Sequence, residues 1–380
     1  MSGEQGTERY DVVIIGAGQA GLAAGYHLAK RGVDYVILDA NDRIGDTWRN
    51  RYDSLRLYSP ARYDGLPGLP FPLPGSAYPT GDQMADYLES YADHFRMPIQ
   101  TGVRVDALQR ADQGRDGFVV LAGGRRYEAA QVIVATGTFQ RPHVPDFADQ
   151  LDPAIRQLHS SEYRNPAQLA NGRVLVVGLS HSGADLAFEV AQSHRTIVSG
   201  KSHGQLPVSV DSRAGRMGWP IWKFVAWNLL TLRTPIGRMM APEVRKGGAP
   251  LLRHRRTELL RAGVELADSK TVAVEAGKPV LADGRVLDVA NVIWCTGLRP
   301  DYHWIDLPIV DDDGWPVQTR GVVDSTPGLY FLGLLFQYSF TSMLVVGAGR
   351  DAAYVADRIA SRASTRRFTP DHEPTPSPAS

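Results

Sequence analysis

The glycine-rich turn close to the N-terminus is the feature of this sequence that most restricts its fold. A short β-branched run, Asp11 to Ile15, is typical of a buried strand in a parallel sheet, and it leads directly into Gly16-Ala17-Gly18-Gln19-Ala20-Gly21. Helix-forming residues follow from Leu22 to Ala29, and a second apolar run, Tyr35 to Leu38, ends at Asp39. This order of strand, turn, helix, strand and acid predicts a Rossmann-like dinucleotide-binding unit.

Each glycine of this turn has a separate role in binding a dinucleotide. Gly16 permits the tight turn, Gly18 lets the backbone approach a pyrophosphate, and Gly21 lets helix and strand pack closely. The start of the helix presents unpaired N–H groups to the phosphates. Asp39 lies 21 residues after Gly18, close to the roughly 20 expected for a carboxylate that accepts the ribose hydroxyls. A purely structural turn is the alternative, but it does not account for all these features in register.

The same plan recurs downstream with one change. Arg173 to Gly178 is a second buried-strand pattern, and Ser182-Gly183 opens a helical run that is followed by a strand at Thr196 to Val198. Ser180 stands where the first turn has its middle glycine. We predict a second nucleotide unit here, on an imperfect match.

Lys201 suggests which nucleotide the second unit prefers. It follows Gly178 by 23 residues, which is the spacing from Gly16 to Asp39. A carboxylate repels a 2′-phosphate, whereas an ammonium group attracts it. We therefore predict an adenine nucleotide with a free ribose on the first unit and NADPH on the second. The alternative is that Lys201 is an ordinary solvated lysine.

Two further segments echo each other and indicate an internal duplication. Val132 to Gly137 and Val292 to Gly297 are both buried-strand patterns that end in Thr-Gly, at Thr136-Gly137 and Thr296-Gly297. We predict that each Thr-Gly turns the chain where it passes from one nucleotide domain toward the other. The predicted fold class is α/β with two Rossmann-like domains.

These stretches resemble the single-component flavin-containing monooxygenases, which are two-dinucleotide-binding flavoproteins with bacterial and YUCCA-like members. The matching segments span nearly the whole chain in family order: Gly16 to Gly21, Gly45 to Leu55, Tyr78 to Gly81, Ala135 to Gly137, His159 to Tyr163, Thr296 to Asp301 and Gly347 to Ala352. The resemblance implies FAD on the first unit, NADPH on the second, and an NADPH domain inserted into a discontinuous FAD domain.

The implied domain limits follow from that resemblance. The FAD-binding domain covers residues 1–164 and 288–366, and the NADPH-binding domain covers residues 165–287. Residues 367–380 are rich in proline and almost free of apolar side chains, so we predict a disordered tail there.

The resemblance also implies roles for individual residues. Asp39 holds the ribose of FAD, Thr47 and Trp48 line FAD, and Val105 lies near the adenine. Tyr58 takes the position beside the reacting flavin carbon, where asparagine or histidine is common in the family. The remaining predicted cofactor-binding residues are Gly16, Gly18, Ala20, Gly21, Ala135, Thr136, Gly137, Gly178, Ser180, Ser182, Gly183, Lys201, Thr296 and Gly297.

The implied activity is monooxygenation with FAD, NADPH and O2. NADPH reduces FAD, and the reduced flavin forms a C4a-hydroperoxide that oxygenates a small sulfide or amine, or a carbonyl or 2-oxo acid. No metal or acid–base pair is needed. One alternative is an FAD-dependent oxidoreductase that reduces a quinone or another acceptor, and a second is a flavin-binding protein without turnover. Cys295 is the only cysteine, which excludes a redox dithiol within the chain.

Composition restricts the partners. The chain has 41 basic and 41 acidic side chains, whereas a general nucleic-acid binder needs a basic surplus. Met1 to Arg9 is short and polar, unlike a signal peptide, so we expect a cytoplasmic protein. Trp219 to Met240 is the most apolar stretch, but Lys223, Arg233 and two prolines interrupt it, and a membrane span needs about 20 apolar residues.

A basic segment with aromatic side chains lies inside the predicted NADPH domain. Residues 213–261 carry 11 lysines or arginines against two acids, Glu243 and Glu258, a local net charge of +9. Tryptophans and a phenylalanine are interleaved with the first of these cations. A lid over an apolar or amphipathic substrate, a helix at a membrane surface and a solvated helical insertion are the three interpretations. The oligomeric state stays open.

Overall fold

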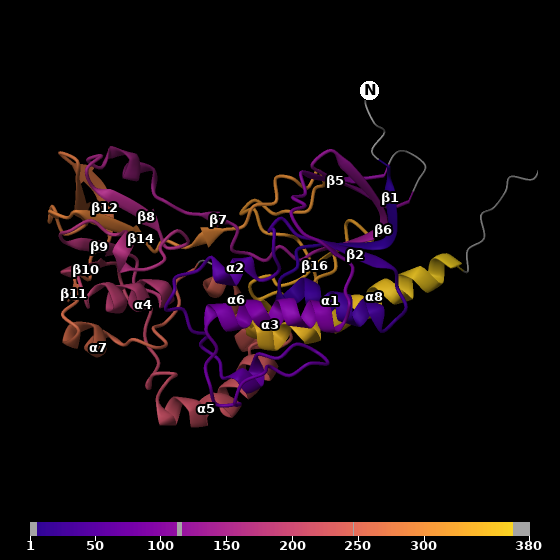
Figure 1. Ribbon diagram of the computed structural model, residues 1–380, viewed down its shortest axis with the longest axis horizontal. Helices are drawn as coiled ribbons and strands as arrows, with labels where there is room; N and C mark the ends of the chain where they lie inside the picture. The colour runs from indigo at the N-terminus through magenta and orange to yellow at the C-terminus, as the bar shows by residue number, and fades with distance from the viewer. Residues whose placement is uncertain (1–5, 112–115, 246, 368–380) are drawn as a thin grey trace, which may run out of the picture.

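The computed structural model describes residues 6–111, 116–245 and 247–367. The chain forms two lobes, each built on its own sheet, and β7 (Arg141–Pro142) lies between them (Figure 1). The lobe at the right of the figure contains the N-terminal strand and the C-terminal helix, so the chain leaves this lobe and later returns to it. The predicted α/β fold with one domain nested in the other is confirmed.

The first lobe has a seven-stranded sheet with helices on one face. Its strands run in the order β3-β2-β1-β6-β5-β4, and β16 pairs with β6. The strand bounds are β1 (Glu8–Ile15), β2 (Tyr35–Leu38), β3 (Ile99–Gln100), β4 (Ala107–Arg110), β5 (Phe118–Ala122), β6 (Arg125–Val134) and β16 (Leu329–Phe331). The helices are α1 (Gln19–Ala29), α3 (Gly81–His94) and α8 (Val345–Arg367).

Side chains along β1 point alternately to the two faces of the sheet, and both faces are buried. Val12 and Ile14 pack with side chains of α1, α3 and α8. Val13 and Ile15 point the other way and pack with β4, β5 and the segment around Tyr302. These four side chains, at the end of β1, are at most 4% exposed. The glycine turn that follows β1 is therefore fixed to a rigid strand.

The second lobe has a five-stranded, fully parallel sheet. Its order is β11-β10-β9-β14-β8. The bounds are β8 (Arg156–His159), β9 (Val174–Val177), β10 (Thr196–Ser199), β11 (Glu265–Leu266) and β14 (Asn291–Trp294). One face carries α4 (His181–Val190) and α7 (Arg256–Arg261), and the other carries apolar residues of the hairpin of β12 (Thr271–Glu275) and β13 (Lys278–Leu281).

Strand pairing gives domain limits that differ from the predicted ones. β14 pairs with both β8 and β9, so β8 and β14 belong to the second sheet. The limits predicted at residues 164 and 288 assign both strands to the first domain and are wrong by one strand at each end. A short buried strand pattern does not state which sheet the strand will join, because that depends on pairing with distant residues.

The two Thr-Gly segments are the crossings between the lobes. Gly137 and Gly297 both have a positive φ, of 71° and 82°, which permits the sharp turn after β6 and β14. The chain then forms β7 and β15 (Leu298–Arg299), which pair antiparallel. This arrangement agrees with the prediction for both segments.

Only part of the basic segment packs on the second lobe. α5 (Arg213–Phe224) continues into a π-turn at Val225–Leu229 and then α6 (Pro235–Arg245). The Trp219 ring stacks on Tyr63 of the first lobe at 5.3 Å between centroids. The Phe340 N–H donates to the Leu230 carbonyl oxygen at 2.9 Å. α5 and α6 therefore pack against the first lobe, whereas α7 packs on the second sheet.

The remaining short elements are α2 (Asp46–Arg49) and four 3₁₀ turns at Ala61–Tyr63, Asp146–Gln150, Pro166–Gln168 and Phe340–Met343. Of the predicted tail, Arg367 ends α8, and residues 368–380 lie outside the described residues. Within the described part of the chain, no helix combines the length and the apolar character that crossing a bilayer requires.

Candidate functional site

The first glycine turn is built so that two of its glycines cannot be replaced. Gly16 has a φ of 108°, and a Cβ atom there would lie 2.7 Å from the carbonyl oxygen of Ala135. A Cβ at Gly21 would lie 1.9 Å from the carbonyl oxygen of Gly16. The turn therefore locks β1, α1 and the Ala135-Thr136-Gly137 crossing together, as the sequence pattern predicts.

Gly18 differs from its two neighbours because protein packing does not require it. A Cβ at Gly18 would meet no atom within 4 Å. Gly18 is the residue immediately before α1, and no side chain caps the helix there. No side chain therefore stands at this position, which fits the close approach of a dinucleotide's pyrophosphate to the start of α1.

Asp39 lies against this turn from the end of β2. One carboxylate oxygen accepts the Ala17 N–H at 2.6 Å, and the other accepts the N–H and the Nδ2 of Asn41, both at 2.8 Å. The Val103 N–H donates to the Asp39 carbonyl oxygen at 2.8 Å, which brings Val105 to the same edge of the sheet. The donor and acceptor groups present fit the ribose and adenine of FAD.

Other predicted FAD residues surround the turn. Ala20 is buried, and its Cβ lies 3.1 Å from the Cβ position of Gly333, in the chain after β16. Trp48, in α2, is half-buried and packs against the apolar layer of α1 and α3. Thr47, beside it, is exposed. The structure thus brings the chain after β16 against the start of α1 and places α2 beside α3.

The second glycine turn has the same backbone construction. Gly178 has a φ of 110°, and a Cβ there would lie 2.4 Å from the carbonyl oxygen of Cys295. A Cβ at Gly183 would lie 1.9 Å from the carbonyl oxygen of Gly178. The Cys295 N–H donates to the Val177 carbonyl oxygen, just as the Ala135 N–H donates to that of Ile15. Thr296-Gly297 therefore meets this turn as Thr136-Gly137 meets the first.

The middle position of the second turn is not open. The Ser180 hydroxyl donates to the Ala249 carbonyl oxygen at 3.2 Å and accepts the Ala249 N–H at 3.1 Å. Ser182, two residues further on, is half-buried in the first turn of α4. The glycines that permit the turn fit a second dinucleotide, but its middle position carries a side chain that is bonded to the Ala249 backbone.

Backbone hydrogen bonds show which residue of the second unit corresponds to Asp39, and it differs from the predicted one. The Gly16 N–H donates to the Leu38 carbonyl oxygen, and the Gly178 N–H donates to that of Ser199. Gly200, not Lys201, therefore corresponds to Asp39. Equal spacing failed by one residue because the helix and loop between the two strands differ in length. Lys201 is exposed and follows β10 directly after Gly200.

Tyr58 belongs to a buried polar cluster that joins the lobes. Its hydroxyl donates to Asp185 of α4 at 2.8 Å, and the Tyr52 hydroxyl donates to the same oxygen at 3.4 Å. The Arg253 guanidinium donates to that oxygen at 3.4 Å and to the Leu57 carbonyl oxygen at 2.9 Å. Asp185 and Arg253 are 8% and 9% exposed, so the cluster is shielded from water.

Burial dominates the protonation of this cluster. It raises the pKa of Asp185, and the neighbouring Arg253 partly opposes that shift. Burial and the carboxylate together raise the pKa of Tyr58 well above its ordinary value. The sequence signal for Asp185 was an acid inside the helical run after the second turn. Arg253 had no local signal, because its partners lie far away in sequence.

Two further motif residues are structural. The His159 Nε2 lies 3.0 Å from the Gly297 carbonyl oxygen and its Nδ1 lies 2.7 Å from the Ser161 hydroxyl, so the ring ties β8 to a crossing. Burial raises the pKa of the Cys295 thiol to about 12, which keeps it protonated and unreactive at neutral pH.

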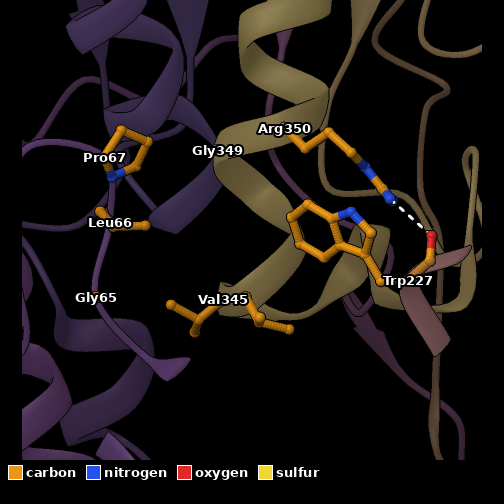
Figure 2. Close-up of a pocket in the computed structure, with 8 residues that line it drawn as sticks. Gly65, Leu66, Pro67, Trp227, Val345, Gly349 and Arg350 are labelled. Carbon is orange, nitrogen blue, oxygen red and sulfur yellow. Dashed lines mark hydrogen bonds between the residues drawn. The ribbon is translucent and has the colours of Figure 1, made fainter. Parts of the chain in front are cut away.

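A separate pocket of about 340 Å³ opens where the basic segment meets α8. Figure 2 shows the Trp227 ring beside Arg350, whose guanidinium donates to the Trp227 carbonyl oxygen at 2.9 Å and lies 4.1 Å from the ring centroid. Leu66, Pro67 and Val345 supply apolar walls. The pocket is lined by neither glycine turn, and each nitrogen of the Arg350 guanidinium already donates to a protein acceptor.

Two nested units, each with a glycine turn ahead of its first helix, define a protein with two dinucleotide-binding units. Comparisons with known proteins agree with that class. The family described as pyridine nucleotide-disulphide oxidoreductase matches residues 13–207. An uncharacterized oxidoreductase, CzcO-like, of Geobacillus kaustophilus is 39% identical over 352 residues, which are 92% of this chain and 98% of that protein.

Two proteins with monooxygenase names are also similar. The probable indole-3-pyruvate monooxygenase YUCCA7 of Arabidopsis thaliana is 30% identical over 391 residues, covering 92% of this chain and 87% of its own. The structure of the flavin-containing monooxygenase from Stenotrophomonas maltophilia matches with a TM-score of 0.74 at 27% identity, over 94% of this chain and 99% of that one. The chain therefore belongs to the flavin monooxygenase family of CzcO- and YUCCA-like flavoproteins, within the pyridine nucleotide-disulphide oxidoreductases.

Proposed function

We propose that the protein is an NADPH-dependent flavoprotein monooxygenase that binds FAD at the first turn. The observation that carries the proposal is the pair of glycine turns with one backbone construction, in a member of this family. NADPH and a proton supply two electrons, one atom of O2 joins the substrate, and the other leaves as water. The substrate is a small sulfide or amine, or a carbonyl or 2-oxo acid.

In this proposal the residues of the first lobe hold and orient FAD. Gly16, Gly18 and Gly21 bring the start of α1 to the pyrophosphate, and the Asp39 carboxylate accepts the ribose hydroxyls. When bound, FAD accepts hydride from NADPH and activates oxygen. The chain's own task is to position the cofactors and exclude water.

Tyr58 is proposed as a positioning residue beside the flavin rather than as a base. Its hydroxyl proton is held toward Asp185 at 2.8 Å, and its raised pKa keeps it neutral. The Arg253 guanidinium lies 4.8 Å from its ring centroid and also binds the backbone at Leu57. The second lobe thus sets the position of the segment that carries Tyr58.

The proposed function is tested by comparing the O2 consumed with the oxygenated product and the hydrogen peroxide formed. The purified protein is supplied with NADPH in air together with a thioether, an alkylamine or an aromatic 2-oxo acid, and consumed O2, oxygenated product and hydrogen peroxide are measured. We expect one class to give a product that accounts for most of the O2 consumed. Peroxide alone with every class, or quinone reduction without O2 uptake, would favour the reductase alternative. No NADPH oxidation at all would favour the non-catalytic alternative.

We also propose that α5 rests on an anionic membrane surface, with the protein in the cytoplasm. Met217, Ile221 and Phe224 repeat at helical spacing and are 80%, 71% and 60% exposed, while Trp219 packs inward on the first lobe. Figure 1 shows α5 at the lower edge of the molecule. The exposed Arg213 and Arg216 of α5 complement anionic lipid.

Flotation with liposomes tests this contact. Vesicles rich in phosphatidylglycerol should carry the protein upward, whereas purely zwitterionic vesicles should not. Replacing Met217, Ile221 and Phe224 together by serine should abolish flotation and leave the melting temperature unchanged, because these side chains are exposed. Equal recovery of the two proteins in the soluble fraction would refute the membrane contact.

A further inference from the structure

The segment Gly247–Leu251, here called the strap, lies across the start of α4. Ser180 holds it through the two hydrogen bonds with the Ala249 backbone, at 3.2 and 3.1 Å. These bonds join residues 69 positions apart in sequence. A single hydroxyl therefore satisfies both the donor and the acceptor of one strap residue.

The far end of the strap is fixed to the chain that follows β10. The Leu251 N–H donates to the Gly204 carbonyl oxygen and the Leu206 N–H donates to that of Leu251, both at 2.9 Å. The Leu251 side chain is fully buried. The strap thus bridges the start of α4 and the segment after β10. These two elements enclose the crevice at the carboxyl ends of the strands, where such folds bind dinucleotides.

His181 contributes a second contact to the strap. Burial lowers the pKa of its imidazole to about 4, and a hydrogen bond with the backbone of Pro250 opposes that shift. Its Nε2 is buried without a hydrogen-bond partner among the described atoms, and its ring lies 5.2 Å from that of Tyr58. The ring stays neutral at physiological pH and fills the space beneath Pro250.

The first turn shows what the strap replaces. Gly18 and Gln19 stand where the second turn has Ser180 and His181, and the position of a Cβ at Gly18 is open. We propose that the strap occupies the pyrophosphate place of the second unit, and that Ser180 and His181 set the affinity for NADPH by holding it there. This inference rests on the proposed function, since it takes NADPH as the ligand of the second unit.

The strap has the backbone freedom that displacement requires. Gly247 and Gly248 have φ values of 83° and 81°, a region that glycine enters without strain. A Cβ at Gly247 would meet no atom within 4 Å. Beyond the strap, Arg253 is fixed by Asp211 at 2.6 Å. These contacts hold the chain from Leu251 onward in place, so displacement of the strap involves the residues before Leu251.

The cost of displacing the strap should appear in the apparent affinity. A ligand that binds only the displaced form has its apparent Kd raised by the inverse of that form's population. Losing the two Ser180 hydrogen bonds increases this population, and a net hydrogen bond corresponds to about fivefold in an equilibrium constant. We expect Ser180→Gly to tighten NADP⁺ binding about five- to twentyfold, and the double variant with His181→Gln to tighten it further.

Titration of the FAD-loaded protein with NADP⁺, together with hydrogen exchange of the strap amides, tests the proposal. Ser180→Gly and His181→Gln copy the first turn, and Ser193→Gly at the other end of α4 is the matched control. We expect Ser180→Gly and His181→Gln to show a lower Kd for NADP⁺ and faster exchange of the Ala249 amide. The control Ser193→Gly should behave as the wild type. Unchanged or weaker binding by both variants, with wild-type binding intact, overturns the strap alone. If no protein binds NADP⁺ although all retain FAD, the proposed function fails as well, and the exchange rates still show whether Ser180 holds the strap.

Discussion

The two glycine turns share one backbone construction but differ in what stands in front of the helix. At the first turn, Gly18 leaves the space clear. At the second, the Ser180 hydroxyl is bonded to Ala249. The first turn has a carboxylate beside it, Asp39, whereas its counterpart in the second is Gly200. The glycines that shape the turn are thus common to both units, and the residues that select and admit a nucleotide are not.

The largest expected effect comes from the third glycine of each turn. Gly21→Ala and Gly183→Ala both place a Cβ 1.9 Å from a carbonyl oxygen, which forces the helix away from the strand and costs about 2 kcal/mol or more. We expect Gly21→Ala to purify with little FAD, and Gly183→Ala to retain FAD but to lose NADPH-dependent flavin reduction. Absorbance at 450 nm per protein measures the first and anaerobic stopped flow the second. Equal loss of FAD in both variants would contradict the binding of FAD at the first turn alone.

Asp39→Asn should have the next largest effect. The charged carboxylate accepts hydrogen bonds on both oxygens, and hydrogen bonds to charged groups contribute about 1.5–3 kcal/mol each. We expect FAD affinity of the apoprotein to fall about 10- to 100-fold, measured by fluorescence quenching. Asp42→Asn, at an exposed neighbour, is the control and should leave FAD binding unchanged. A small effect of Asp39→Asn would show that the ribose is held elsewhere.

Lys201→Ala should discriminate the two pyridine nucleotides. Its ammonium group is exposed just after Gly200, so we expect it to contribute to the 2′-phosphate alone. The Kd for NADPH should rise about tenfold, as for one charge-assisted contact, and that for NADH should stay the same. Lys278→Ala, which removes a lysine already paired with Asp288 at 2.8 Å, is the control. Equal weakening of both nucleotides would contradict this role.

His181 predicts a pH dependence that the first turn lacks, because its counterpart is Gln19. Its pKa is about 4 in the folded protein, against an ordinary value of 6.5, so the unfolded chain takes up the proton first as pH falls. The stability it provides is present above pH 6.5 and is lost toward pH 4. Between pH 7.5 and 5.5 the wild type should lose about 1.4 kcal/mol more than His181→Gln, measured by urea unfolding. Parallel losses in the two proteins would contradict the buried neutral ring.

The first turn could be predicted from the sequence because all its determinants are local. Strand, glycines, helix and Asp39 follow one another within one βαβ unit, and packing preserves that order. The strap and the Asp185 cluster could not be predicted in this way. Ser180 meets Ala249 across 69 positions and Tyr58 meets Asp185 across 127, and no spacing rule connects such residues.

The predicted domain limits and the predicted alignment of Lys201 with Asp39 failed for the same reason. Both depend on how distant segments pair, which a local sequence pattern does not contain. Strand pairing, which depends on residues far apart, placed β8 and β14 in the second sheet. A difference of one residue in the connection between β9 and β10 made Gly200 the counterpart of Asp39. The basic segment was visible as composition, but its return to the first lobe depends on contacts such as Trp219 with Tyr63.

Hydrogen exchange of the FAD-loaded protein with and without NADP⁺ tests most directly whether the two turns bind different nucleotides. We expect amides 16–21 to be already protected by FAD and not to respond to NADP⁺. Amides 181–184 should gain protection, while the strap amide at Ala249 should lose it. Protection by NADP⁺ at the first turn, or no response at the second, would contradict the assignment of FAD to one unit and NADPH to the other.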